Sequence, residues 1–156
     1  PLQFRQFLRY RKHDINLNLG IYTEKGKIKY YQFQRSEYNT FSEETYSNTV
    51  KQGIKKINEI LIDVDTYNNI VTEKLKGIPP VILFLDAEGL DFSILQSIDY
   101  IHFAPKIICV ETYAYGAGKK DVNLINFLLA KGYIIHADTF VNTIFIHNRI
   151  LNDALS

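Results

Sequence analysis

The segment from residue 81 to residue 91, VILFLDAEGLD, limits the possible folds of this chain more than any other segment does. Its first five residues are all apolar, which predicts a strand buried on both faces, as in a parallel sheet covered by helices. The strand ends at Asp86, and Glu88 follows two positions later. Ligands of open α/β sheets bind at the carboxyl ends of the strands. We therefore expect Asp86 and Glu88 to stand at the rim of a site.

Strands and helices alternate along the rest of the chain. We expect strands at 81–85, 106–111, 133–137 and 142–147, and helices at 91–98 and 121–131. This alternation is typical of βαβ units in a parallel sheet. Only residues 138–141 separate the last two strands, too few for a crossover, so these strands should be antiparallel. The predicted fold class is α/β, with a mostly parallel sheet and an antiparallel last strand.

The first half of the chain has a different pattern. Residues 15–22 alternate between apolar and polar, and residues 28–33 follow a turn signal, so we expect these two segments to pair as a β-hairpin. A short helix is expected at 4–10, and Ser42 is suited to cap a second helix.

Length and composition set the limits of the fold and of its partners. The 156 residues amount to a single domain, which we divide into an N-terminal hairpin region at 1–75 and a βαβ core at 78–150. The net charge of +1 gives no electrostatic basis for binding nucleic acid. The chain contains no apolar run long enough to span a membrane. We therefore predict neither nucleic acid nor membrane as a partner.

The cysteine and histidine content narrows the chemistry. The single cysteine, Cys109, excludes an internal disulfide and fits a reducing compartment, so we expect a cytoplasmic protein. The four histidines lack the spacing of metal ligands, and no metal site is predicted.

Several short segments, taken in order, resemble the FkbM-type methyltransferases. They are DINLNLGI at 14–21, NTFS at 39–42, LDAEGLD at 85–91, PKII at 105–108, GY at 132–133, ADT at 137–139 and NTIF at 142–145. The likeness covers nearly the whole chain. It implies a Rossmann-like class I methyltransferase fold. It also implies transfer of a methyl group from S-adenosylmethionine to a hydroxyl of a sugar or another small-molecule natural product.

The resemblance and the strand ends together give the candidate site residues. Asp86 and Glu88 are expected nearest the chemistry, where a carboxylate can help to remove the hydroxyl proton. Glu111 closes the neighbouring strand and is expected to support them as a third catalytic residue. The resemblance implies substrate-binding roles for Asn39, Thr40 and Asn142.

Each candidate also has a structural alternative. Asp86 can simply end its strand while Glu88 caps the next turn, and Glu111 can pair with a lysine such as Lys119. The segment at 39–42 can cap a helix, and Asn142 can shape the turn before the last strand.

The resemblance also implies that part of the cofactor site lies outside residues 1–156. Class I methyltransferases hold their cofactor with a glycine-rich turn after the first strand and an acid after the second, in the manner of dinucleotide folds. This chain has no such glycine pattern after a strand, and the family's counterpart of residues 4–21 follows both elements. We therefore expect the first two strands to be missing, the cofactor-binding residues to be unknown, and residues 1–156 alone to be inactive.

Two missing strands would leave a gap of about 10 Å between the predicted strands at 15–22 and 81–85. Exposed sheet edges favour association, so a homo-oligomer formed through the open edges is one expectation. The alternative function is a catalytically incompetent remnant that acts as a binding or self-association module.

Overall fold

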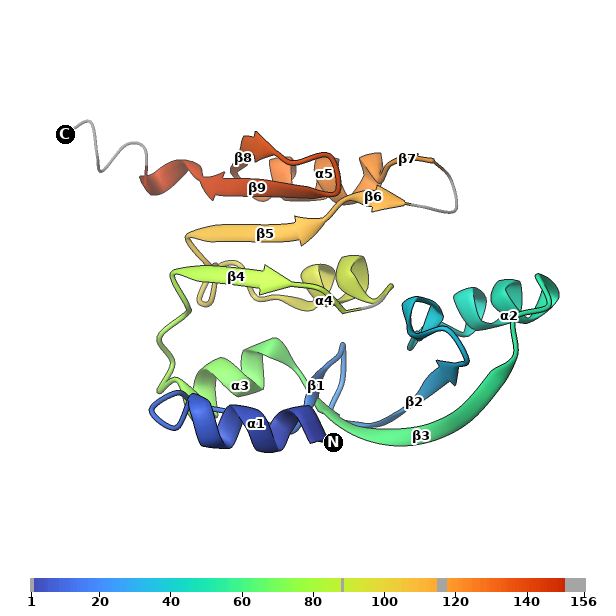
Figure 1. Ribbon diagram of the computed structural model, residues 1–156. Coiled ribbons are helices and arrows are strands. Elements are labelled where there is room, and N and C mark those ends of the chain that lie inside the picture. The colour runs from blue at the N-terminus through green and yellow to red at the C-terminus, as the bar shows by residue number, and fades with distance from the viewer. Residues whose placement is uncertain (1, 88, 115–117, 151–156) are drawn as a thin grey trace.

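The computed structural model describes residues 2–87, 89–114 and 118–150 (Figure 1). The N-terminal half contains α1 (Leu2–Tyr10), β1 (Gly20–Ile21), β2 (Gly26–Phe33), the 3-10 helix η1 (Ser36–Tyr38), α2 (Glu43–Lys51), β3 (Lys56–Asp65) and α3 (Tyr67–Lys74). The C-terminal half contains β4 (Ile82–Leu85), α4 (Asp91–Ser97), β5 (Ile107–Glu111), β6 (Tyr113–Ala114), β7 (Lys119–Lys120), α5 (Val122–Ala130), β8 (Tyr133–Asp138) and β9 (Asn142–His147). The segment boundaries predicted after residue 81 agree with these elements to within one residue.

The C-terminal half forms a four-stranded sheet in the order β4-β5-β9-β8. The strands β4 and β5 are parallel, but β9 is antiparallel to both of its neighbours, β5 and β8. The prediction of an antiparallel last strand is confirmed. The prediction of a mostly parallel sheet is wrong, because β9 turns back from β8 within four residues and enters the sheet between β8 and β5.

The N-terminal half forms a separate three-stranded sheet in the order β1-β3-β2. The predicted hairpin between residues 15–22 and 28–33 is wrong. The first of these segments contributes only β1, which is parallel to β3, whereas β2 pairs antiparallel with β3 along its whole length. The ten-residue β3 is the central strand, because β1 pairs with one of its edges and β2 with the other. The loop from β1 to β2 crosses the end of β3, where Lys25 forms an ion pair with Asp65 at 3.0 Å.

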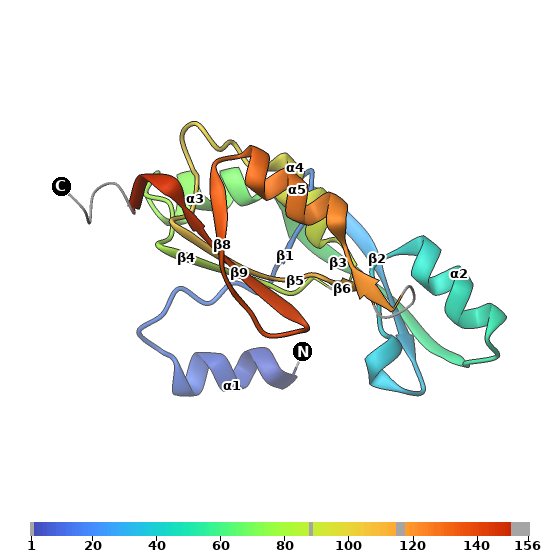
Figure 2. The same ribbon diagram turned by 90° about the horizontal axis from the view of Figure 1, so that it is seen from above.

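Two helices cover one face of the four-stranded sheet, as Figure 2 shows for α4 and α5. Apolar side chains from both helices and from the central strands are at most 2% exposed: Ile94, Leu95, Ile108, Val110, Leu124, Leu128 and Phe145. Burial of each contributes roughly 1.5–3 kcal/mol, so this layer is the main source of stability for the C-terminal half. No helix within the described ranges is both long and apolar enough to cross a membrane.

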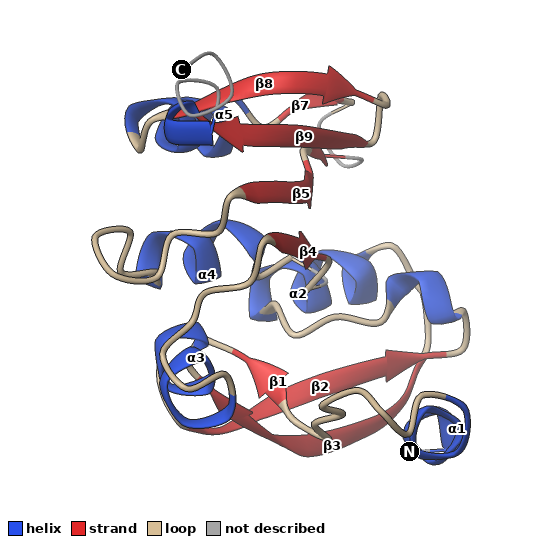
Figure 3. Cartoon of the chain, turned by 90° about the vertical axis from the view of Figure 1, so that its left-hand side faces the viewer, coloured by secondary structure: helices blue, strands red, loops and turns tan. Residues whose placement is uncertain are grey.

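Helix α3 connects the two sheets (Figure 3). The Asn68 side chain donates a hydrogen bond to the Ser97 carbonyl at 2.9 Å and accepts one from the Asp99 amide at 3.0 Å. The Tyr67 hydroxyl donates to the Phe103 carbonyl at 2.9 Å. These bonds join the helix that follows β3 to the segment between α4 and β5, and so they fix the position of one sheet relative to the other.

Candidate functional site

A cavity of about 450 Å³ lies between the two halves of the chain, at the carboxyl end of β5. Its lining residues come from four segments: Glu37, Tyr38, Asn39, Thr40 and Thr45 around η1 and α2; Gly89, Asp91 and Phe92 at the start of α4; Glu111, Thr112 and Tyr113 after β5; and Asp121 and Leu124 at the start of α5. Both halves therefore build the walls of this cavity.

The register of β4 and β5 determines where the first acids lie. The strands are parallel and Leu85 pairs with Val110, so the residues that follow them, Asp86 and Glu111, stand at the same edge of the sheet. The negative charge of Asp86 contributes to raising the pKa of Glu111. The structure thus brings together two of the three predicted catalytic residues. The third, Glu88, lies outside the described residues.

The loop before α4 joins the two halves at Gly89. This glycine has φ of +94°, a backbone conformation that residues with a side chain rarely adopt. A methyl group added to it would lie within 4 Å of the side chains of Ser42 and Thr45. The Ser42 hydroxyl caps α2 by accepting a hydrogen bond from the Thr45 amide at 3.2 Å, which confirms the predicted cap. This contact holds the segment before α2 against the acids of the second sheet.

Two carboxyl groups in the cavity lining, Glu111 and Asp91, have raised pKa values. Burial, together with the charges of Asp86 and Asp91, raises the pKa of Glu111. Burial also raises the pKa of Asp91, although the Ala87 amide donates a hydrogen bond to its carboxylate at 3.0 Å and opposes the effect. Among the residues that the structure describes, Glu111 forms no ion pair, so the predicted alternative of pairing with Lys119 is not seen.

Two predicted substrate-binding residues, Asn39 and Thr40, line the cavity. Both also have structural contacts. The Asn39 side chain accepts a hydrogen bond from the Phe33 amide at 2.8 Å, and the Thr40 hydroxyl accepts one from the Ser42 amide at 3.0 Å. These bonds fix the orientation of the two side chains at the cavity wall, and their contact with a substrate stays a prediction.

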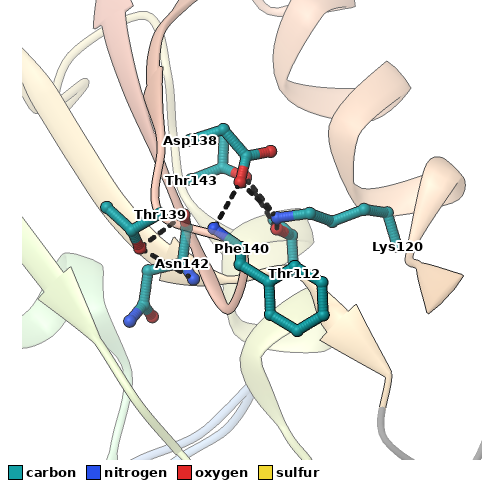
Figure 4. Close-up of polar contacts among 7 residues, drawn as sticks. All are labelled: Thr112, Lys120, Asp138, Thr139, Phe140, Asn142 and Thr143. Atoms are coloured by element: carbon teal, nitrogen blue, oxygen red, sulfur yellow. Dashed lines mark hydrogen bonds and ion pairs between the residues drawn. The ribbon is translucent and has the colours of Figure 1, made fainter. Parts of the chain in front are cut away.

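Two other predicted residues are not in the lining of this cavity, although Asn142 pairs with Glu111 across β5 and β9. Asn142 is at the turn between β8 and β9, where its carbonyl accepts hydrogen bonds from the amide and the hydroxyl of Thr139 (Figure 4). Asp86 lines a neighbouring cavity of about 260 Å³, together with residues of β1 and β4 that include Gly20 and Phe84. Neither Asn142 nor Asp86 is in the lining of the larger cavity.

A lysine supports the floor of the cavity behind Thr112. Figure 4 shows the Lys120 ammonium group within reach of Thr112, Asp138 and Thr143. It donates to the Thr112 hydroxyl at 3.0 Å and to the Asp138 carboxylate at 2.8 Å, and the hydroxyls of Thr112 and Thr143 are 2.6 Å apart. The Lys120 ammonium group lowers the pKa of Asp138. This network holds Thr112, and therefore the adjacent Glu111, in place.

Sequence reasoning missed several lining residues. Asp91 and Asp121 were assigned only to helix starts, and Asp121 does cap α5 through bonds from Asn123 and Leu124. The spacing of Asp91 from the strand end at Asp86 was a signal that could have identified it. Glu37 and Tyr38 gave no such signal, because only the folding of η1 over β5 brings them to the site.

The described residues provide no recognisable S-adenosylmethionine cradle. A cofactor of this kind needs open backbone amides in a glycine-rich turn after a strand. The turn after β4 contains Gly89, but the α2 cap covers it. No three described histidine, cysteine, aspartate or glutamate side chains come together in a way that could hold a metal ion.

The fold and the cavity define a mixed α/β domain with an acid-lined site at the carboxyl end of a parallel strand pair. The methyltransferase FkbM domain matches residues 1–135, which is most of the chain. The chain therefore belongs to the FkbM methyltransferase domain family, as its sequence motifs predicted. Comparison with curated proteins gave no match, and comparison with solved structures gave none.

Proposed function

We propose that this domain supplies the acceptor side of an O-methyltransferase, with a hydroxyl of a sugar or another small natural product as the acceptor. Membership of the FkbM methyltransferase domain family supports the reaction class. The observation that supports the location is Glu111, a half-buried carboxylate in the lining of the larger cavity whose pKa is raised above its usual value.

Glu111 is the proposed general base. A carboxylate with a raised pKa accepts a proton more readily than an ordinary glutamate does. In this proposal it accepts the hydrogen bond of the acceptor hydroxyl and takes the proton as that oxygen reacts. Asn39 and Thr40 line the same wall and are proposed to orient the acceptor, and such positioning contributes much of the rate in group transfer.

S-adenosylmethionine is the proposed methyl donor, on family membership alone. Because the described residues offer no cradle for it, we assign it no site. We also propose a cytoplasmic location. The single cysteine, Cys109, supports this, because a chain that cannot form an internal disulfide fits a reducing compartment.

The test is methyl transfer from labelled S-adenosylmethionine to a panel of sugars, with residues 1–156 joined to the glycine-rich cofactor-binding segment that the family resemblance implies. Glu111→Gln is expected to lower the turnover by about 100-fold or more, since general-base catalysis contributes at least this factor. Glu73→Gln removes an exposed carboxylate from α3 and serves as the matched control. Unchanged turnover in Glu111→Gln contradicts the assignment of the base.

A second candidate function, self-association, is favoured by the open edge of β4. This strand is at the end of the four-stranded sheet, so the prediction that it is buried on both faces is wrong. Phe84 is 75% exposed, beside the exposed Val81 and Ile82. The segment 81–85 carries no charge, so an antiparallel pairing with its own copy brings no like charges together. An edge of this kind suits a two-fold dimer.

Light scattering over a range of protein concentrations tests the second candidate. We expect a concentration-dependent dimer that Phe84→Lys converts to a monomer, because the new charge opposes edge pairing. A wild-type chain that stays monomeric contradicts it. Methyl transfer by the chain joined to the cofactor-binding segment separates the two functions, since turnover favours the enzyme and its absence favours the self-association module.

A further inference from the structure

The larger cavity is lined by charges of one sign. Four of its lining residues are carboxylates, Glu37, Asp91, Glu111 and Asp121, and none of its described lining residues is a lysine, arginine or histidine. The charge of Asp86 adds to this field, because it acts on both Asp91 and Glu111. A ligand that enters the cavity therefore meets a strongly negative surface.

Within the described ranges, hydrogen bonds from the protein reach two of these four carboxylates. Asp121 accepts hydrogen bonds from the amides of Asn123 and Leu124, and Asp91 accepts one from Ala87. No hydrogen bond or ion pair from the described part of the chain reaches the carboxylates of Glu37 and Glu111.

The neighbouring lysine does not neutralise them. Lys120 lies behind Thr112, and its ammonium group is held by the Asp138 carboxylate at 2.8 Å (Figure 4). Two carboxylates from different segments, Glu37 in η1 and Glu111 at the end of β5, therefore have no partner among the described residues that would compete with a ligand.

Three aromatic side chains complete the lining: Tyr38, Phe92 and Tyr113. Two of them are held in place by other rings. Phe92 packs edge-to-face against Phe127 with ring centroids 5.7 Å apart, and Tyr113 lies 4.7 Å from Phe140. Aromatic faces attract cations, and carboxylates form strong charge-assisted hydrogen bonds with ammonium groups. The lining therefore matches an organic cation that also has apolar surface.

We propose that the acceptor carries a protonated amine close to the hydroxyl that is methylated, as in an amino sugar or an amino alcohol. This inference rests on the proposed function, which places the acceptor in the larger cavity. It adds that the acceptor is positively charged. It excludes acceptors that bear a phosphate or a carboxylate. A metal ion would also be positive, but no three described ligand side chains come together to hold one.

Three hexoses of similar shape and different charge provide the test: glucosamine, glucose and glucuronate. Binding is measured by NMR titration of the full chain at about pH 6.5, where the amine is protonated, with EDTA and without any methyl donor. We expect glucosamine to bind at least about tenfold more tightly than glucose, which is about 1.4 kcal/mol, and glucuronate to bind more weakly than either. Added salt should reduce the preference, because it screens the charges.

Two variants locate the effect in the cavity. The double variant Glu37→Gln with Glu111→Gln is expected to lose the preference and to bind glucosamine no better than glucose. The double variant Glu24→Gln with Glu73→Gln removes the same charge from positions outside the cavity lining and should keep the preference. Circular dichroism confirms that each variant is folded.

Equal binding of glucosamine and glucose, a preference for glucuronate, or no binding of any of the three sugars overturns the inference. The readout is independent of methyl transfer. A chain that prefers glucosamine but transfers no methyl group would overturn the proposed function and leave the charge of the ligand established.

Discussion

At the scale of single residues, burial and two neighbouring carboxylates act on Glu111 in the same direction. They raise its pKa, so the folded chain holds this proton more tightly than the unfolded chain does. The free energy of unfolding therefore decreases as the pH rises from the ordinary pKa of a glutamate through the raised pKa of the folded state. The charge that suits Glu111 for catalysis thus lowers the stability of the fold at neutral pH.

Glu111→Gln is consequently expected to stabilise the chain above that pH range. We expect a rise in Tm of about 1–3 °C at about pH 7.5, because the amide removes the repulsion by Asp86 and Asp91. Near about pH 4 the difference should largely disappear, since the wild-type carboxyl is protonated there. Thermal unfolding at both pH values measures the effect, and an equal rise in Tm at both values would show that the charge is not its cause.

The site was only partly predictable at this scale. Asp86 and Glu111 could be placed together because each directly ends an apolar strand. The two strands are parallel and in register, so their carboxyl ends lie at the same edge of the sheet. Glu37 and Tyr38 could not be placed, because they lie in a polar segment with no periodic pattern. Their approach to Glu111 depends on a contact between the two halves of the chain that the sequence does not encode locally.

At the scale of elements, the contact between the β4–α4 loop and the start of α2 depends on Gly89. Its φ of +94° is unfavourable for any residue with a side chain. Gly89→Ala is therefore expected to cost about 1–2 kcal/mol in the free energy of unfolding. Gly26→Ala is the matched control, because an added methyl group there meets nothing within 4 Å and the backbone is not left-handed. Urea denaturation measures the free energy of unfolding of both variants. Equal losses would show that the positive φ of Gly89 does not make its substitution more costly.

Local sequence patterns predicted the positions of strands and helices better than they predicted which strands pair with each other. The strands β4, β5, β8 and β9 and the helices α4 and α5 were found because their apolar periods are clear, whereas the two-residue strands β6 and β7 were missed. The short turn at 138–141 determined the direction of β9. The pairing of β1 and β2 with β3 was missed, because β3 begins 36 residues after the start of β1 and 30 residues after the start of β2. Non-local pairing of this kind is set by tertiary packing, which no local pattern reports.

At the scale of the whole molecule, Asn68 joins the two sheets through its bonds to Ser97 and Asp99. Asn68→Ala leaves a carbonyl and an amide without these partners, and it is expected to cost about 2 kcal/mol. Asn58→Ala is the control, because Asn58 is exposed on β3 and its side chain bonds to Gln32 within the same sheet. Hydrogen exchange is the most informative measurement, since faster exchange in both halves for Asn68→Ala alone would show that the sheets are stabilised together.

Because both halves of the chain form the walls of the cavity, ligand binding there also stabilises the folded chain. Any molecule that fills it contacts η1 on one side and the end of β5 on the other, so it binds only while the two halves keep their relative position. At a concentration of 100 times its Kd, such a molecule would add about 2.7 kcal/mol to the free energy of unfolding. The melting temperature of this chain is therefore a direct reporter for ligand discovery, and a screen of amines and sugars can begin before any reaction has been observed.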